Sequence, residues 1–222
     1  MKLGIAFLFV CGVVSVLFLG IRSQGAQTTT FQITGIVLDD KGSPLANARV
    51  SALHMTRPLK GRLPSSFTDN DGRFKISDLE AARYSVVVEN ETEGYANFLS
   101  IAYQSILTLA EPTEETPSAY VAIQMSPQAG RITGLVTDKN GAKVKEANVK
   151  ICLIADPERC SYGLGDDNGR FQILAPPETV VVVTVSKDER KDFRLKQKIN
   201  GVEKDSLILK SGENHHVRIT LD

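Results

Sequence analysis

The order of apolar and polar positions separates a hydrophobic N-terminal segment from a long region of short β-rich runs. Around Phe74, and again around Phe171, apolar residues alternate with polar ones, which is the pattern of a strand with one buried face. Residues 84–88 and 180–185 are rich in β-branched side chains, as expected of strands inside a sandwich. No helix of ordinary length is indicated after residue 26, so the pattern predicts an all-β protein.

A set of glycines and aspartates recurs along the chain at nearly constant spacing and predicts the same turns twice. Glycine supplies the positive φ that a tight hairpin turn needs, so we assign these positions to structural turns. They are Gly35, Gly42, Asp69 and Gly72 in the first copy, and Gly134, Gly141, Asp166 and Gly169 in the second. The short strands between them predict two tandem antiparallel β-sandwiches, transthyretin-like or immunoglobulin-like, with about seven strands each.

The chain divides into an N-terminal segment at residues 1–26, a first sandwich at residues 31–126 and a second at residues 130–222. Residues 3–21 are small or apolar, which indicates an export signal. This run is longer than most cleavable hydrophobic regions and close to the length that spans a bilayer. A cleaved signal peptide and an uncleaved signal anchor therefore both stay open. We expect an exported protein that is periplasmic, on the cell surface or secreted, or else anchored in the membrane by residues 3–21.

Composition narrows the range of partners. The chain has 26 Lys and Arg against 26 Asp and Glu, so its formal net charge is zero and no broad field attracts nucleic acid or anionic lipid. We therefore expect no nucleic-acid partner, and membrane contact only through an uncleaved N-terminal segment. Aromatic residues make up 6% of the chain and Trp is absent, which weakens the case for carbohydrate stacking without excluding it.

Removal of a signal peptide would leave two cysteines, Cys152 and Cys160, in a compartment that permits disulfides. Between them, Asp156 and Pro157 are typical turn residues, so the two cysteines can face each other across a hairpin. A disulfide there would close a short loop and restrict the unfolded chain. The alternative is a pair of buried, unbonded thiols.

Residues that can bind metals or take part in catalysis occur in the sequence, but not at the spacing of a known metal or catalytic motif. The acidic turn at residues 69–72 resembles the start of a calcium loop, but Asp78 stands where that loop needs a bidentate Glu, so a hairpin turn is favoured. His215 and His216 are adjacent and would point to opposite faces of a strand, which argues against joint ligation. Neither a nucleophile elbow nor a zinc-protease helix motif occurs. We expect no metal, no cofactor and no enzymatic activity.

Three aromatic residues, Tyr95, Phe98 and Tyr103, lie in a segment with weak strand character. If they are exposed together, they form a candidate binding surface for a ligand or another protein. The alternative is that they pack into the core.

The repeated motifs resemble the carboxypeptidase regulatory-like domain family, a transthyretin-like (prealbumin-like) β-sandwich. In the first copy the resemblance rests on Gly35, Val37, Asp39, Gly42, Pro44, Leu45, Ala48 and Val50, followed by Thr68, Asp69, Gly72 and Phe74. In the second copy it rests on Gly134, Val136, Gly141, Ala147, Val149, Asp166, Gly169 and Phe171, while Lys143 replaces the proline and Gly165 the threonine. The resemblance implies two tandem domains of this fold with a non-catalytic accessory role.

These observations lead to one expected function and one alternative. We expect a non-enzymatic, exported protein of the bacterial envelope whose two sandwiches act as a structural or protein-interaction module. The alternative is a carbohydrate or glycan-binding module that uses loops at one end of a sandwich. The expected partner is accordingly an unknown protein or glycan of the cell envelope.

Overall fold

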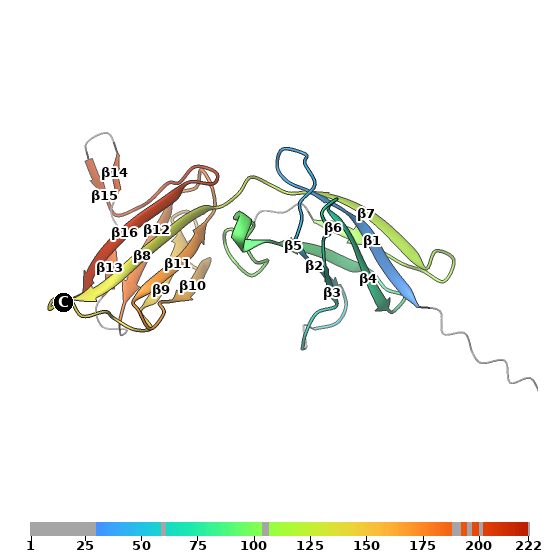
Figure 1. Cartoon of the computed structure of the whole chain (residues 1–222), viewed down its shortest axis with the longest axis horizontal. Helices are drawn as coiled ribbons and strands as arrows, with labels where there is room; N and C mark the ends of the chain where they lie inside the picture. Colours follow the sequence, from blue (N-terminus) through green and yellow to red (C-terminus); the bar gives the residue numbers. More distant parts are fainter. Residues whose placement is uncertain are drawn as a thin grey trace, which may run out of the picture.

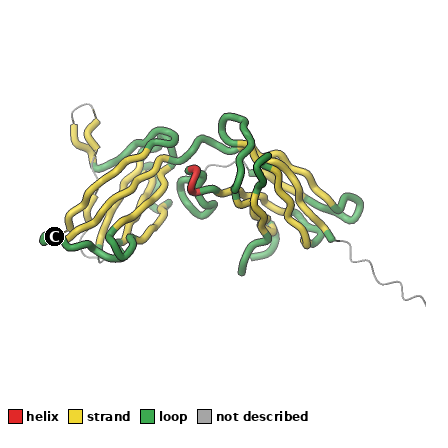
Figure 2. The backbone as a smooth tube through the Cα atoms, viewed as in Figure 1, coloured by secondary structure: helices red, strands yellow, loops and turns green. Residues whose placement is uncertain are grey.

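The computed structural model describes residues 30–58, 61–103, 107–187, 192–194, 197–199 and 202–221. The predicted signal or anchor at residues 1–26 lies outside this part of the chain. Within the described ranges, no helix is both long and apolar enough to cross a membrane. These residues form two β-sandwiches that follow one another along the chain (Figure 1 and Figure 2). The prediction of an all-β fold is confirmed.

The first sandwich packs a three-stranded sheet, in the order β4-β1-β7, against a four-stranded sheet in the order β3-β2-β5-β6. Its strands are β1 (Phe31–Leu38), β2 (Arg49–His54), β3 (Ser65–Phe67), β4 (Arg73–Leu79), β5 (Tyr84–Glu89), β6 (Thr108–Ala110) and β7 (Ser118–Gln124). A single turn of 3-10 helix, η1 (Glu91–Glu93), follows β5. The three-stranded and four-stranded sheets enclose the first core between them.

The second sandwich repeats this plan, with one sheet in the order β11-β8-β16 and the other in the order β10-β9-β12-β13. Its strands are β8 (Gly130–Asp138), β9 (Asn148–Leu153), β10 (Cys160–Leu164), β11 (Arg170–Ala175), β12 (Val181–Ser186), β13 (Asp192–Arg194) and β16 (Asn214–Leu221). A separate hairpin pairs β14 (Gln197–Ile199) with β15 (Val202–Lys204). Apart from this hairpin, the two sandwiches have matching strand orders.

The prediction of fully antiparallel sandwiches is wrong at one place in each sandwich. Strand β7 pairs with β1 in parallel, and β16 pairs with β8 in parallel. Each of these pairs joins the first and last strands of its sandwich, and the chain runs through the opposite sheet between them. Because no hairpin connects the two strands, the antiparallel direction is not imposed on them. Sequence pattern shows which residues are buried in a strand, but not the direction of its neighbour.

Each sandwich has its own apolar core. Ile33 and Val37 of β1 have no exposed surface, and Ile132 and Val136 of β8 are equally buried in the second core. Burying apolar surface contributes roughly 25 cal/mol for each Å² removed from water, which is the main favourable energy of such a small sandwich. Because these side chains fill the interiors, the surfaces that can meet a ligand or partner are the loops, the outer sheet faces and the junction.

Four aspartates form the same turn in the two sandwiches. In each, a side-chain Oδ1 accepts hydrogen bonds from the backbone N–H groups two and four residues further on, at 2.7 to 3.0 Å. A glycine with φ between 70° and 85° stands three residues after each aspartate. The pairs are Asp39 and Gly42, Asp69 and Gly72, Asp138 and Gly141, and Asp166 and Gly169. The aspartate oxygens therefore organise the backbone of these hairpins.

Gly35 and Gly134, which the sequence grouped with the turn glycines, lie instead inside β1 and β8. The reason for glycine at these positions is space. A Cβ atom on Gly35 would collide with the carbonyl oxygen of Val121 and with the ring of Phe74. On Gly134 it would collide with the ring of Phe171. In both sandwiches an aromatic ring packs directly over a glycine of the strand. A side chain in place of that glycine would displace the ring.

Candidate functional site

The segment between β5 and β6 makes both apolar and polar contacts with the second sandwich. Residues 90–103, which we call the bridging segment, start in the first sandwich and reach the second. Figure 1 and Figure 2 show η1 and the loop after it lying between the two sandwiches. The segment is the candidate functional feature of the molecule because it determines how the two sandwiches are joined.

The start of the bridging segment is fixed to the first sandwich. Asn90 caps η1 by accepting a hydrogen bond from the N–H of Glu93, and Gly94 ends it with φ of 84°. Tyr95 is 4% exposed and belongs to the first core. Its hydroxyl donates to Oδ1 of Asp40 at 3.1 Å, and burial raises the pKa of Tyr95 to about 12. Tyr95 is therefore not part of an exposed aromatic surface.

The other two aromatic residues of that predicted surface, Phe98 and Tyr103, are half-buried. With Tyr95 in the core, the three rings do not present one open face. Of the two predictions made for Tyr95, an exposed binding surface or packing in the core, the second is correct. Its ring lies in the apolar interior, and its hydroxyl has a polar partner.

The far end of the bridging segment inserts into the second sandwich. Ile101 is 7% exposed and is counted in the second apolar core, together with residues of β8 and β12. Its backbone N–H donates to Oγ of Ser161 on β10 at 2.8 Å, and the Ser161 hydroxyl lies 3.3 Å from that of Ser100. A small buried cluster of Ala96, Ala102, Ala129 and Leu174 packs beside this insertion. A residue encoded in the first sandwich thus completes the interior of the second.

Arg131 of β8 makes the reciprocal contact from the second sandwich. Its Nη2 donates to the carbonyl oxygens of Glu91 and Thr92, each at 2.9 Å, and its Nη1 donates to Oε1 of Gln172 at 3.3 Å. The connecting chain is also hydrogen bonded, because the N–H of Ala129 donates to the carbonyl of Gly94 at 2.9 Å. The junction therefore combines apolar burial with directional hydrogen bonds from both sides.

The strand that receives the bridging segment is tied by a disulfide. Cys152 of β9 and Cys160 of β10 are directly opposite each other, and their sulfur atoms are bonded. The neighbouring residues Leu153 and Arg159 share a ladder hydrogen bond. Antiparallel ladders alternate, so the cysteines occupy a non-hydrogen-bonded pair, where side chains come closest. The predicted disulfide is confirmed, and it holds the edge strand that carries Ser161.

A cleft of about 420 Å³ lies between the bridging segment and the edges of β10 and β11. Leu99 on one side and Tyr162 on the other are both 74% exposed. Glu91 is the only carboxylate among the described residues that line it, and Cys160 is held in the disulfide. The cleft is also lined by Ser100 and Ser161, whose hydroxyl groups lie 3.3 Å from each other, and the Ser161 hydroxyl accepts the N–H of Ile101. The exposed apolar pair can contact a partner.

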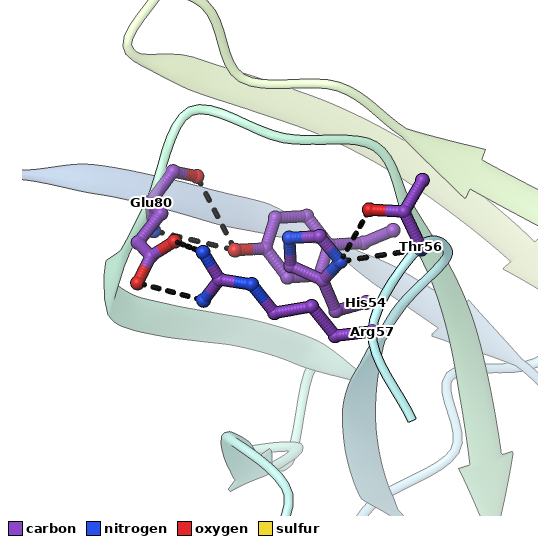
Figure 3. A network of polar contacts seen from close by, with 5 residues as sticks. His54, Thr56, Arg57 and Glu80 are labelled. Carbon is purple, nitrogen blue, oxygen red and sulfur yellow. Dashed lines mark hydrogen bonds and ion pairs between the residues drawn. The ribbon is translucent and has the colours of Figure 1, made fainter. Parts of the chain in front are cut away.

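A cluster of polar side chains lies in the first sandwich, apart from the bridging segment. Figure 3 shows His54, Thr56, Arg57 and Glu80 around a tyrosine ring, that of Tyr84. Arg57 and Glu80 form an ion pair at 2.7 Å, and the hydrogen bond from Arg57 lowers the pKa of Glu80. The hydroxyl of Tyr84 exchanges hydrogen bonds with the backbone of Glu80. His54, Arg57, Glu80 and Tyr84 line a cavity of about 390 Å³.

This polar cluster lacks the arrangement of a catalytic triad. His54 Nδ1 lies 3.3 Å from both the backbone N and the hydroxyl of Thr56, and its ring meets Tyr84 edge-on at 5.4 Å. The Glu80 carboxylate is paired with Arg57 and does not orient His54. The geometry is that of a stabilised loop with an adjoining hollow.

The histidines of the last strand also lie apart from one another. His215 is half-buried, while His216 is exposed on the opposite face and its Nδ1 lies 3.0 Å from Oγ1 of Thr133. In the described ranges, no group of three or more His, Cys, Asp or Glu side chains is placed to hold a metal ion.

Sequence reasoning missed the residues that join the sandwiches: Ile101, Ser161 and Arg131. Ile101 stands in an irregular loop, where neither period two nor period 3.6 identifies a buried position. Ser161 and Arg131 have the ordinary polar character of strand residues that face out of a sheet. Only the folded arrangement of the two sandwiches shows that Ile101 reaches Ser161 and that Arg131 reaches the carbonyl groups of Glu91 and Thr92.

Comparison with known proteins finds a family model that is similar to part of the chain. The family model described as "Carboxypeptidase regulatory-like domain" matches residues 32–110. This range holds β1 to β6 and the bridging segment, and it ends before β7. The second sandwich lies outside the matched range. No curated protein matches the sequence.

Comparison with solved structures finds several matches at low sequence identity. The Bacillus anthracis TIE protein has 14% identity and a TM-score of 0.34, over 86% of this chain and 34% of its own. The Streptococcal ancillary pilin has 13% identity and a TM-score of 0.34, over 85% of this chain and 63% of its own. GBS52, the minor pilin of Streptococcus agalactiae, has 11% identity and a TM-score of 0.37, over 86% of this chain and 94% of its own. The chain thus spans about a third of the first protein and less than two thirds of the second.

Proposed function

We propose that the chain is a non-enzymatic, exported structural or protein-interaction module of a bacterial envelope, in keeping with the match of residues 32–110 to the carboxypeptidase regulatory-like family model. In this proposal the two sandwiches act as one body with a fixed relative orientation. The apolar N-terminal segment supports export, and the family supports an accessory role without catalysis.

The observation that carries the proposal is the insertion of Ile101 into the second core. Two domains joined only by a short linker move relative to each other unless a sizeable apolar contact holds them. Here one side chain of the first sandwich is buried in the second, and Arg131 returns two hydrogen bonds across the junction, to the carbonyl oxygens of Glu91 and Thr92. A fixed pair of sandwiches presents its loops and outer faces at constant distances, which suits a scaffold.

The test is the substitution Ile101→Ala in the full-length chain, with Leu99→Ala as its matched control. Truncation of a buried Ile costs about 2–5 kcal/mol, so the second sandwich should lose stability although the changed residue belongs to the first. Leu99 is 74% exposed and should have almost no effect. Small-angle X-ray scattering should show a wider spread of interdomain distances for Ile101→Ala only. If the unaltered chain already needs many domain orientations to fit its scattering, the proposal is wrong.

A second candidate function is glycan binding by loops at the end of the first sandwich. It is supported by the cavity of about 390 Å³, which offers hydrogen-bonding groups of Arg57, Arg62 and Glu80 beside the ring of Tyr84. Titration with neutral oligosaccharides tests it. A saturable rise in melting temperature that Arg62→Ala removes would favour this function, and the lack of any shift would exclude it for those sugars.

A further inference from the structure

The outer face of the β11-β8-β16 sheet carries cationic side chains on all three strands. Inward and outward positions alternate along each strand, so every second residue faces solvent. The outward residues in the middle of the face are Arg170 and Gln172 of β11, Arg131, Thr133 and Leu135 of β8, and His216 and Arg218 of β16. We call this set the basic face.

Strand register fixes how these residues stand relative to one another. Leu135 is paired with Arg170 on one side and with Arg218 on the other. Adjacent strands are about 4.8 Å apart, so the two arginines start about 10 Å from each other, with Leu135 between them. In the next row Thr133 is paired with Gln172 and His216. Two guanidinium groups are therefore followed by a row of hydrogen-bonding side chains.

The arginines of the basic face form no direct ion pair among the described residues, although the Asp166 carboxylate at its border attracts Arg170. None of the ion pairs between described residues involves Arg131, Arg170 or Arg218. Arg131 donates to carbonyl and amide oxygens, which carry no net charge. The carboxylate that borders the face, Asp166, accepts the N–H groups of Asn168 and Arg170 within its turn. A groove of about 750 Å³ runs beside these residues.

We propose that the basic face binds an acidic polysaccharide, a glycan chain with carboxylate groups at intervals. Arginine presents a planar fork of donors that binds a carboxylate through two parallel hydrogen bonds. Two such forks about 10 Å apart fit a polymer with repeated charges better than one small anion. Gln172, Thr133 and His216 supply the donors and acceptors that sugar hydroxyl groups need. Arg131 also takes part in the junction, but Arg170 and Arg218, which carry the proposal, form no hydrogen bond or ion pair with the described residues of the bridging segment, and none of these arginines lines the loop cavity of the first sandwich. The proposal therefore does not depend on either function.

The chemistry of the face favours a glycan over a nucleic acid. Proteins that bind single-stranded nucleic acids combine basic grooves with aromatic rings on which the bases stack. The outward positions of β8, β11 and β16 include no Phe or Tyr, and Phe171 is buried on the inner side of the sheet.

The first sandwich provides an internal control, because its corresponding sheet has the same register with different residues. Ile36 of β1 is paired with Arg73 and Ala122, and Thr34 is paired with Lys75 and Tyr120. Its two cations therefore lie on a single edge strand, β4. Where the second sandwich has Arg218, the first has Ala122, so Arg218→Ala converts one row of the basic face to the pattern of the first sandwich.

The experiment measures binding of polygalacturonate to the full-length chain, kept in a neutral detergent because of residues 3–21. We expect saturable binding that weakens steeply with added salt, since exposed charges are screened. Arg218→Ala and Arg170→Ala should each weaken it about tenfold, the equivalent of one charge-assisted hydrogen bond. Arg73→Ala in the first sandwich should leave it unchanged. Thermal unfolding of each variant should match that of the unaltered chain, because these side chains are exposed.

Several outcomes would overturn this proposal. Equal binding to neutral dextran would show that the carboxylates are not recognised. Tighter binding to single-stranded DNA than to polygalacturonate would assign the face to a different polymer. An effect of Arg73→Ala as large as that of Arg218→Ala would mean that general charge attraction, and not the basic face, holds the polymer.

Discussion

The two sandwiches share strand order and turns but differ at the edge hairpin of their four-stranded sheets. In the first, β3 has three residues and follows a long connection from β2. In the second, β10 has five residues, and the disulfide between Cys152 and Cys160 ties it to β9. The longer, tied strand is the one that receives Ile101 through Ser161.

This difference shows how one fold can be used in two ways. The first sandwich supplies a bridging segment, whereas the second supplies the edge that accepts it and a sheet face with cations on every strand. The shared features, such as the aspartate turns, maintain the fold. The features that differ lie at the edge, in the loops and on the outer faces, where substitutions do not disturb the core. Substitutions that exchange features between the sandwiches therefore test what each feature contributes.

The largest effect is expected from Gly35→Ala. A Cβ atom there would meet the backbone carbonyl of Val121 as well as the ring of Phe74, so β1 and β7 have to move apart. Overpacking of this kind typically costs 1–3 kcal/mol, and we expect about 3 kcal/mol because a backbone atom is involved. Chemical denaturation of the full-length chain should show the loss in the transition of the first sandwich.

The matching substitution in the second sandwich, Gly134→Ala, serves as the comparison. Its Cβ would meet side-chain atoms of Phe171 and Val217, which can shift by rotation. We expect a smaller loss, about 2 kcal/mol. A larger loss for Gly134→Ala than for Gly35→Ala would contradict the explanation based on the Val121 carbonyl.

Much of the fold could be predicted because burial and turn chemistry are local properties of the sequence. Alternation around Phe74 and Phe171 predicted buried strand faces, and both rings are 5–6% exposed. The two cysteines on either side of a short turn predicted the bridge that the structure contains. These predictions needed only period two and the preferences of Asp, Gly and Pro.

The remaining features depend on contacts between residues far apart in the sequence. Parallel pairing of β1 with β7 follows from the path of the chain through the opposite sheet, which no local pattern records. Gly35 and Gly134 were assigned to turns because a positive φ is the commoner reason for glycine, whereas here the reason is a ring from another strand. The junction was missed because Ile101 and Ser161 are 60 residues apart.

A further prediction concerns the disulfide that distinguishes the two edge hairpins. Replacing both Cys152 and Cys160 by serine should destabilise the second sandwich by about 2.5 kcal/mol, because the bridge restricts a short loop in the unfolded chain. Hydrogen exchange of the β10 amides should become faster, and scattering should show a looser junction. Cys11→Ser is the matched control, since it removes a thiol without changing the bridge. Unchanged exchange in β10 would mean that strand pairing alone holds this edge.

The smallest effects are expected at a position that the two sandwiches fill differently. The first sandwich has a threonine there, Thr68, and the second has a glycine, Gly165. Thr68 is 3% exposed, and its Oγ1 accepts from the N–H of Ala48 at 2.9 Å and donates to the carbonyl of Leu45 at 2.6 Å. Thr68→Val keeps the shape and removes both hydrogen bonds, so two buried backbone groups lose a partner. The cost should be about 1–2 kcal/mol, which calorimetry can resolve as a lower melting temperature of the first sandwich.

The reciprocal change, Gly165→Thr, tests whether the second sandwich can use the same device. Gly165 occupies the corresponding place, and its added Cβ would lie 3.3 Å from the backbone nitrogen of Ala147, the counterpart of Ala48. If the strand shifts by a few tenths of an ångström, the new hydroxyl can accept a hydrogen bond from that N–H. Replacing glycine also lowers the conformational entropy of the unfolded chain, which further stabilises the folded state. We expect the second sandwich to gain about 0.5 kcal/mol. A clear loss would show instead that its turn has closed too tightly around glycine for the threonine arrangement of the first sandwich to be restored.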